Sequence, residues 1–185
     1  MTETAAERIL AAVQQILVTE GIEEVSIRNV AKAAGVSIGA IQHHYRSKDE
    51  LLMAAMDRVS EQFMDRVMAA TDPGAAPLTN LTAVCHILGG VDDESRVASV
   101  IWLAYASKAV TSETVARAHQ ESWHLMEDSL TMLLQQVNPG LGSDHAATLM
   151  AILDGIAIAR VTETDRMTSD RARRLINAFL TQCTS

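Results

Sequence analysis

The chain has 185 residues, 48% of them apolar and 21% charged, and a formal net charge of −8. This composition is typical of a globular protein and excludes the intrinsically disordered class. No apolar run approaches the roughly 18 residues that a membrane span requires. We therefore expect a cytoplasmic protein with no membrane partner, whose two distant cysteines, Cys85 and Cys183, are reduced thiols.

Helices are expected along the whole chain. Aromatic residues make up only 3% of it, Ala, Leu, Val and Met are plentiful, and three prolines interrupt it. This balance favours helices over strands and predicts an all-α protein. Apolar periodicity and stop signals place nine helices at about 4–20, 27–34, 38–45, 47–71, 78–88, 94–110, 111–137, 143–162 and 168–182.

The first predicted helix, about 4–20, carries Ile9 and Val13 at helical spacing. Thr4 is a candidate N-cap, because its hydroxyl can accept a hydrogen bond from an unpaired amide of the first turn. Gly21 is a candidate stop. The first helix should therefore end just before a short crossover to the next one.

The second and third predicted helices, 27–34 and 38–45, form a helix-turn-helix pattern. A small residue, Ala31, lets two helices cross closely, Gly35 permits the positive φ of a turn, and Ile41 supplies a buried β-branched side chain. All three fall at the spacing that this motif requires. Ser26 and Ser37 are the candidate N-caps of the two helices.

A capping box is expected at the start of the long fourth helix, where Glu50 follows Ser47 at the third position and should reach back to it. Its apolar residues follow a 3.6-residue period as far as the stop at Asp72-Pro73-Gly74. The later helices begin and end at similar signals. They include Gly89-Gly90 and Asn138-Pro139-Gly140.

Charge is unevenly distributed along the chain. Residues 1–48 contain five basic and five acidic side chains, whereas residues 49–185 contain ten basic and eighteen acidic ones. No acidic residue occurs from Val25 to Lys48, a stretch that carries Arg28, Lys32, Arg46 and Lys48. We expect this basic stretch to face a DNA backbone and the acidic remainder to point away from it. The expected domains are a DNA-binding domain at 1–47 and a second domain at 48–185.

The segment from Ser26 to Leu52 resembles the DNA-binding signature of the TetR/AcrR family of bacterial transcriptional regulators, through SIRNVAKAAGVSIGAI, HHY and SKDELL. The C-terminal part is similar to the BetI-like branch through WLAYASKAV, the region around Trp123 and LMAILDGIAIAR. The resemblance implies a nine-helix fold with an N-terminal helix-turn-helix domain. It also implies a C-terminal domain that binds a small-molecule inducer and dimerises through the last two helices.

The resemblance also implies which residues contact the double-stranded DNA operator. They are Arg28, Ser37, Gly39, Ala40, Gln42, His43, His44, Tyr45 and Lys48. Gly39 would let the backbone approach DNA, Ala40 would touch a thymine methyl, and Lys48 would contact phosphate. Gln42 departs from the family, which usually has Tyr there. Alternatively, Lys32 and Arg46 are solvated surface charges without a DNA contact. The alternative for His44 is a packed, hydrogen-bonded side chain.

Candidates for an inducer pocket are the large amphipathic and apolar side chains of the middle helices and of the linking helix. They are Phe63, Trp102, Tyr105, Trp123 and Met126. Plain core packing is the alternative for each. The acidic second domain suggests a cationic ligand held by aromatic rings. The helix at 143–162 is apolar on more than one face, so it should be buried both by its own core and by a partner chain; the alternative is the internal core of a monomer.

Other functions are weighed on the same residues. His119, Trp123 and Glu127 share one helical stripe and His86 lies elsewhere, so a metal or acid-base site is an alternative. No nucleophile motif, P-loop or dinucleotide loop is visible, and we expect no enzymatic activity, cofactor or metal. The sequence predicts a homodimeric, ligand-responsive repressor of a pseudo-palindromic operator. The alternative is a helical ligand-binding or metal-dependent protein that does not read DNA.

Overall fold

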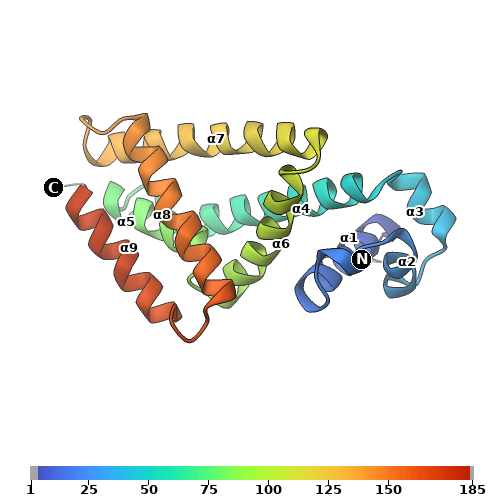
Figure 1. The fold of residues 1–185 in the computed structure, drawn as a ribbon. Coiled ribbons are helices and arrows are strands. Elements are labelled where there is room, and N and C mark those ends of the chain that lie inside the picture. The colour runs from blue at the N-terminus through green and yellow to red at the C-terminus, as the bar shows by residue number, and fades with distance from the viewer. Residues whose placement is uncertain (1–3, 184–185) are drawn as a thin grey trace. The chain divides into compact units, whose positions relative to one another are not determined.

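The computed structural model describes residues 4–183. Across that range the secondary structure is nine α-helices and one short 3₁₀ helix with no strand (Figure 1), which confirms the predicted all-α fold. The elements are α1 (Ala5–Thr19), η1 (Ile22–Glu24), α2 (Ile27–Ala34), α3 (Ile38–His44), α4 (Lys48–Ala70), α5 (Pro77–Leu88), α6 (Asp93–Ala109), α7 (Glu113–Val137), α8 (Ser143–Thr162) and α9 (Ser169–Cys183).

The chain forms two compact units. The first consists of Met1–Glu61 with Val100–His119, and the second of Gln62–Ser99 with Gln120–Ser185. The chain passes from one unit to the other inside α4, α6 and α7 rather than at a linker. The expected boundary between residues 47 and 48 does not coincide with this division. It stays a prediction about which residues bind DNA.

The helix starts of the first unit follow from local hydrogen bonds. Thr4 Oγ1 accepts from Glu7 N at 3.2 Å while Glu7 Oε2 accepts from Thr4 N at 2.7 Å, so a full capping box opens α1. Ser26 Oγ accepts from Asn29 N at 3.2 Å and Ser37 Oγ from Ala40 N at 3.0 Å. These bonds satisfy amides that a helix start leaves without a partner, and all three predicted N-caps are confirmed.

The turn between α2 and α3 is built as its spacing predicts. Gly35 adopts the left-handed conformation with φ of +63°, which an L side chain rarely adopts. Ala31 is 5% exposed and Ile41 is fully buried. A small residue, a glycine and a β-branched residue thus fix the crossing of the two helices.

The start of α4 differs from the expected capping box. Ser47 Oγ accepts from Glu50 N at 3.1 Å, as expected. The Glu50 carboxylate, however, accepts from Arg46 N at 2.6 Å rather than from Ser47 N. The carboxylate therefore closes the connection between α3 and α4 one residue earlier than a capping box would.

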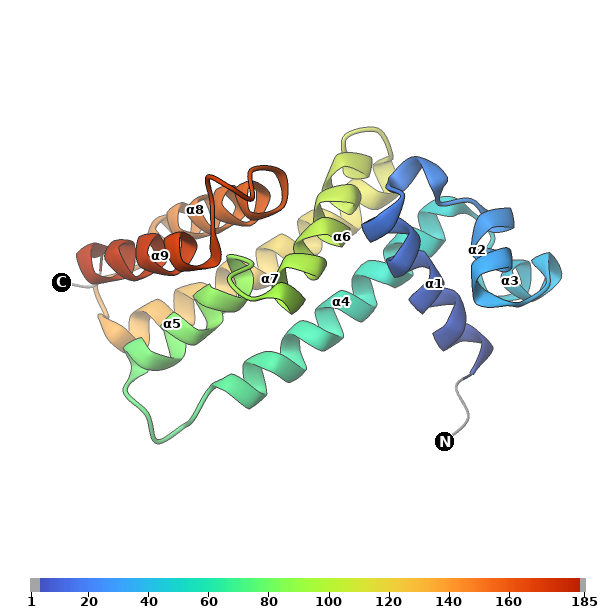
Figure 2. The same cartoon turned by 90° about the horizontal axis from the view of Figure 1, so that it is seen from below.

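The core of the second unit gathers apolar side chains from α5, α7, α8 and α9, with the end of α4 against it. Within this unit α5 contacts both α8 and α9, and α8 and α9 lie side by side (Figure 2). The largest fully buried side chains of this unit are Leu81, Leu130, Leu134, Leu149, Leu153, Ile176 and Leu180. Burial of this apolar surface is the main stabilising term of the unit.

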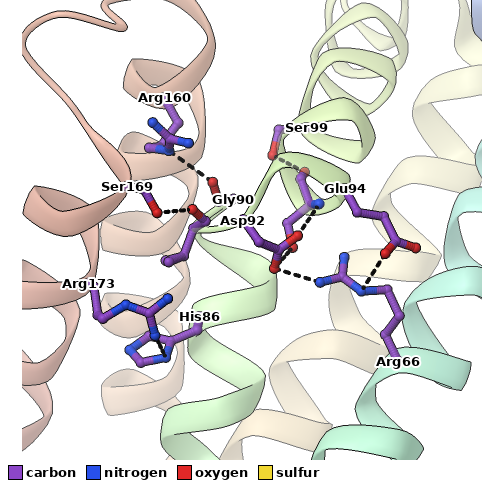
Figure 3. A network of polar contacts seen from close by, with 11 residues as sticks. Arg66, His86, Gly90, Asp92, Glu94, Ser99, Arg160, Ser169 and Arg173 are labelled. Atoms are coloured by element: carbon purple, nitrogen blue, oxygen red, sulfur yellow. Dashed lines mark hydrogen bonds and ion pairs between the residues drawn. The ribbon is translucent and has the colours of Figure 1, made fainter.

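A polar network joins the α5–α6 connection to the α8–α9 connection (Figure 3). The buried Arg160 donates from Nε to Gly90 O and from Nη1 to Met167 O, both at 3.0 Å. Ser169 Oγ donates to Val91 O. A buried guanidinium has to keep its hydrogen bonds, so these contacts hold the two connections together.

The expectation that no apolar run approaches the length of a membrane span is wrong for α8. α8 is long and apolar enough to cross a membrane by length and composition, although no such run was expected. Nearly half of that window, 44%, is buried within the protein. Leu149, Leu153 and Ile156 on its buried face belong to the core of the second unit, which is the position of a core helix.

Candidate nucleic-acid interface and ligand-binding residues

The exposed face of α2 and α3 carries most of the residues expected to contact DNA. Arg28 and Lys32 are exposed on α2, and Gln42, His43 and His44 are exposed on α3. Ile41 on α3 is fully buried, and this fixes which face of α3 packs against the core. The motif therefore presents cations and hydrogen-bonding side chains to solvent.

The first turn of α3 is open to close approach. Gly39 is exposed, and Ala40 is half-buried. Apart from the two chain neighbours and the backbone of the same helix, the only described atom within 4 Å of the point where a Cβ would sit at Gly39 is Ser37 Oγ, at 3.8 Å. The Ser37 hydroxyl accepts the Ala40 amide, so its own proton is available to an external acceptor.

Ile38 is a residue that the sequence interpretation missed. It is 48% exposed although it is a large apolar side chain, and it lies between Ser37 and Gly39. Its position in the first turn of α3 was the available signal, since both neighbours were assigned to DNA. An exposed branched apolar side chain at this point offers contact to a thymine methyl group.

Tyr45 and Lys48 occupy the connection between α3 and α4. Tyr45 is the C-cap of α3 and is half-buried, and burial raises its pKa. Lys48 Nζ donates to Ile22 O at 2.6 Å, so its ammonium already has one partner within the protein. Two of its three donors stay available, and the side chain ties the start of α4 to η1.

A second link holds the start of α4. Asp49 accepts a hydrogen bond from Ser112 Oγ at 2.7 Å and pairs with Lys108 Nζ at 3.3 Å. The Ser112 hydrogen bond lowers the pKa of Asp49, with Lys108 and Lys48 adding to it against the opposing effect of burial. Because Lys108 is in the last turn of α6 and Ser112 precedes α7, this carboxylate links α4 to the α6–α7 connection within the first unit.

The five candidates for ligand binding fall into two groups. Phe63, Trp123 and Met126 pack against the core of the second unit. Trp102 and Tyr105 belong to the first unit, where Tyr105 is buried and stacks on His119 with ring centroids 5.7 Å apart. The structure thus places three of the five on one core.

Asp154 is a second residue that the sequence interpretation missed. This α8 carboxylate is half-buried and accepts a hydrogen bond from Trp123 Nε1 at 3.4 Å. Burial raises its pKa, and the Trp123 hydrogen bond opposes that rise. Its signal was a single acid within the apolar run LMAILDGIAIA. A carboxylate beside an indole ring is the pair of groups that a cationic ligand prefers.

The α8–α9 pair leaves an apolar face exposed. On α8, Ala147, Ala151, Gly155 and Ile158 are exposed at helical spacing, and on α9 Leu175 and Ala178 are exposed. Ile158 is 37% and Leu175 42% exposed. Small residues permit close approach of another helix, so this face is shaped for helix packing.

The next residues to locate are those of the alternative metal or acid-base site, His119, Glu127 and His86. His119 belongs to the first unit and Glu127 to the second, and the His86 ring nitrogens lie against Asn177 and Arg173. Within residues 4–183, no three His, Cys, Asp or Glu side chains gather as metal ligands. His119 has its pKa lowered by burial.

The fold and the basic helix-turn-helix face define the class of a DNA-binding regulator. The family profile described as "Bacterial regulatory proteins, tetR family" matches residues 9–55, and that of the "BetI-type transcriptional repressor, C-terminal" matches residues 77–185. The chain therefore belongs to the TetR family of transcriptional regulators, with a BetI-type C-terminal part. This confirms the resemblance found in the sequence.

Relatives match along nearly the whole chain. The HTH-type transcriptional regulator PksA of Bacillus subtilis is 26% identical over 94% of this chain and 87% of its own length. BetI of Escherichia coli K12 is 27% identical over 98% and 95%. A transcriptional regulator from Rhodococcus sp. Rha1 has a TM-score of 0.88 at 27% identity, covering 97% and 95%. A regulator from Saccharomonospora viridis in complex with choline shares the fold, with a TM-score of 0.86 at 21% identity over 96% and 95%.

Proposed function

We propose that this protein is a cytoplasmic, non-enzymatic homodimeric repressor that binds a pseudo-palindromic operator and is released by a small-molecule inducer. The observation that carries the proposal is the basic outer face of α2 and α3. Arg28 and Lys32 supply phosphate contacts there, and the first turn of α3 supplies base contacts. α4 has residues in both units, so a change at an inducer site would reach the reading head along this helix.

Gel-shift titration on the adjacent promoter at several salt concentrations tests DNA binding. Arg28→Gln should weaken binding to every sequence and reduce the salt slope by about one for each phosphate that the side chain neutralises. Gln42→Ala should instead change the preference among operator variants. Arg117→Gln, which removes a charge from α7 outside the motif, is the matched control. If Arg28→Gln and Gln42→Ala both bind like the control, the docking assignment is wrong.

Dimerisation through α8 and α9 accounts for their exposed apolar face. A twofold pair would bury Ala151, Gly155 and Ile158 against the partner chain. It would also set two recognition helices about 34 Å apart, one turn of DNA. The alternative, in which the apolar faces serve only a monomer, leaves this exposed stripe unexplained.

The inducer is proposed to be an organic cation. Trp123 offers an aromatic face and Asp154 a half-buried carboxylate beside it, with Phe63 and Met126 packed on the same core. The choline bound by the Saccharomonospora viridis regulator has this chemistry. Choline titration by calorimetry should release heat with the wild type and fail with Asp154→Asn. Equal binding by both proteins would remove Asp154 from the site and leave the DNA-binding proposal intact.

A further inference from the structure

An open cleft of about 380 Å³ lies in the second unit among α4, α5, the α5–α6 connection and α9. None of the five expected ligand-binding residues lines it. The lining residues are Arg66, Ala69, Ala70, Ala83, His86, Ile87, Val91, Asp92 and Arg173. Two arginines and a histidine from three helices thus share one hollow. Nothing in the DNA-binding surface or the choline proposal uses them.

The two arginines are not equivalent. Arg66 pairs with Asp92 at 2.7 Å and with the more exposed Glu94 at 3.7 Å (Figure 3). Arg173 forms no ion pair with any carboxylate of residues 4–183. Instead its Nη1 lies 3.3 Å from His86 Nδ1. A guanidinium has five N–H donors, so most of those of Arg173 stay available to a ligand in the cleft.

The hydrogen bonds of His86 define its protonation state. A guanidinium only donates, so His86 Nδ1 accepts from Arg173 and carries no proton. His86 Nε2 then donates to Asn177 Oδ1 at 2.8 Å. Burial lowers the pKa of His86 and the nearby Arg173 lowers it further, against the hydrogen bond to Asn177. A neutral imidazole therefore faces a cation that no described carboxylate neutralises.

We propose that this cleft is an effector site for a small oxyanion, the carboxylate or phosphate group of a metabolite, bound by Arg173 and accompanied by proton uptake on His86. The planar guanidinium matches either oxyanion with two parallel hydrogen bonds. An anion between the two side chains removes the repulsion that disfavours an imidazolium beside Arg173. This site is separate from the inducer site and does not depend on DNA binding.

The other charged groups around the cleft are consistent with an incoming anion. Asp92 is already engaged, because Oδ1 accepts from Ser95 N and Oδ2 from Ser95 Oγ and Arg66. Its charge is thus offset by Arg66. Asp170, one turn before Arg173 on α9, is exposed and forms no ion pair with the described cations. Of the two arginines that line the cleft, Arg173 is the one left to an external anion.

The test follows the Hε1 proton resonance of His86 by NMR, assigned by its loss in His86→Gln. Sodium sulfate and sodium acetate serve as probes of the two oxyanion geometries, at an ionic strength held constant with chloride. Sulfate keeps one charge state across the range studied, about pH 5.5 to 7.5. In the wild type at least one probe should shift the resonance saturably and raise the pKa of His86.

The matched variants are Arg173→Gln and Arg174→Gln, neighbours that are both exposed on α9. Arg173→Gln should weaken the binding of the probe roughly tenfold or more, the effect expected when a charge-assisted hydrogen bond is removed. Arg174→Gln should bind like the wild type. Saturation by acetate alone identifies a carboxylate ligand, and saturation by sulfate alone a phosphate or sulfate ligand. The proposal is overturned if neither probe saturates, or if Arg173→Gln responds like Arg174→Gln.

The pH dependence provides a second readout. Binding that takes up a proton on His86 should tighten as pH falls from about 7.5 to 5.5. Because His86→Gln lacks the Hε1 resonance, binding to it and to the wild type is compared by calorimetry, and the variant should show no such dependence. Equal pH dependence in both proteins would show that another group takes up the proton and would overturn the role of His86.

Discussion

Two helix pairs of this molecule each pack one apolar side into a core, but their exposed sides differ in chemistry. α2–α3 and α8–α9 each bury one side in the core of their own unit, through Val30 and Ile41 in the first pair and Leu153 and Ile176 in the second. The outer side of α2–α3 carries arginine, lysine, glutamine and histidine. The exposed side of α8–α9 carries alanine, glycine, isoleucine and leucine.

The difference shows that the exposed side of each helix pair, which is not needed for the core, is the side that can be specialised for binding. A basic, hydrogen-bonding face gains free energy from a polyanion because counterions are released. A face of small and apolar side chains gains it from a matching surface, for which a second copy of the chain is available. We therefore propose that the first face binds DNA and that the second binds the partner protomer.

Placing charge on the exposed side of α8 should produce the largest effect. Ala151→Glu combined with Ile158→Glu would force four carboxylates into a twofold interface, so the protein should become monomeric. Operator affinity should fall roughly 100-fold, because two linked reading heads bind far better than one. Sedimentation and gel-shift titration measure both. Leu125→Glu, at a 69% exposed apolar position on α7, should stay dimeric; a dimeric double variant would refute the assignment.

The two faces of α3 can be separated with one residue type. Ile41→Ala empties a fully buried site and should cost about 2–5 kcal/mol of unfolding free energy. Ile38→Ala, three positions earlier and 48% exposed, should cost under about 1 kcal/mol. It should nevertheless lower affinity for operators that carry thymine under this turn. Urea unfolding and gel shifts give the two readouts. Equal stability losses would mean that Ile38 belongs to the core.

Local rules explain why α1 and the α2–α3 pair were predictable in detail. The N-caps at Thr4, Ser26 and Ser37 and the turn at Gly35 depend on neighbours within about four residues, which the sequence displays directly. The extents of α2 and α8 match the predicted ranges for the same reason. Burial of Ile41 follows from the spacing of the motif.

Contacts between distant residues were not predictable in this way. Asp49 lies 63 positions from Ser112, and Trp123 lies 31 from Asp154. Such pairs depend on how helices cross, and a helical pattern fixes only which side faces inward. The same limit applies to the aromatic residues. Their apolar character did not indicate that Tyr105 and Trp123 belong to different compact units.

Two carboxylates, one in each unit, should respond to pH with opposite signs, and Asp154 should give the larger response. Burial raises its pKa above the ordinary value of 3.8, so its charged form lowers stability above the raised pKa. Asp154→Asn should therefore melt at higher temperature than the wild type at about pH 7. The gap should close as pH falls below 3.8. Asp128→Asn, exposed on α7, is the control; an Asp154→Asn protein less stable than the wild type at neutral pH would contradict this.

Asp49 should show the smallest effect and the reverse sign. Its pKa is lowered from 3.8, chiefly by the Ser112 hydrogen bond, so its contribution to stability is present above 3.8 and lost as pH falls through the lower folded value. Asp49→Asn should melt below the wild type from about pH 5 to 7. The deficit should be under about 1 kcal/mol, because this ion pair is partly exposed. It should shrink below pH 3.8. Asp65→Asn, exposed on the same helix, should show no such convergence. A deficit independent of pH would mean that Asp49 stabilises α4 through packing and not through its charge.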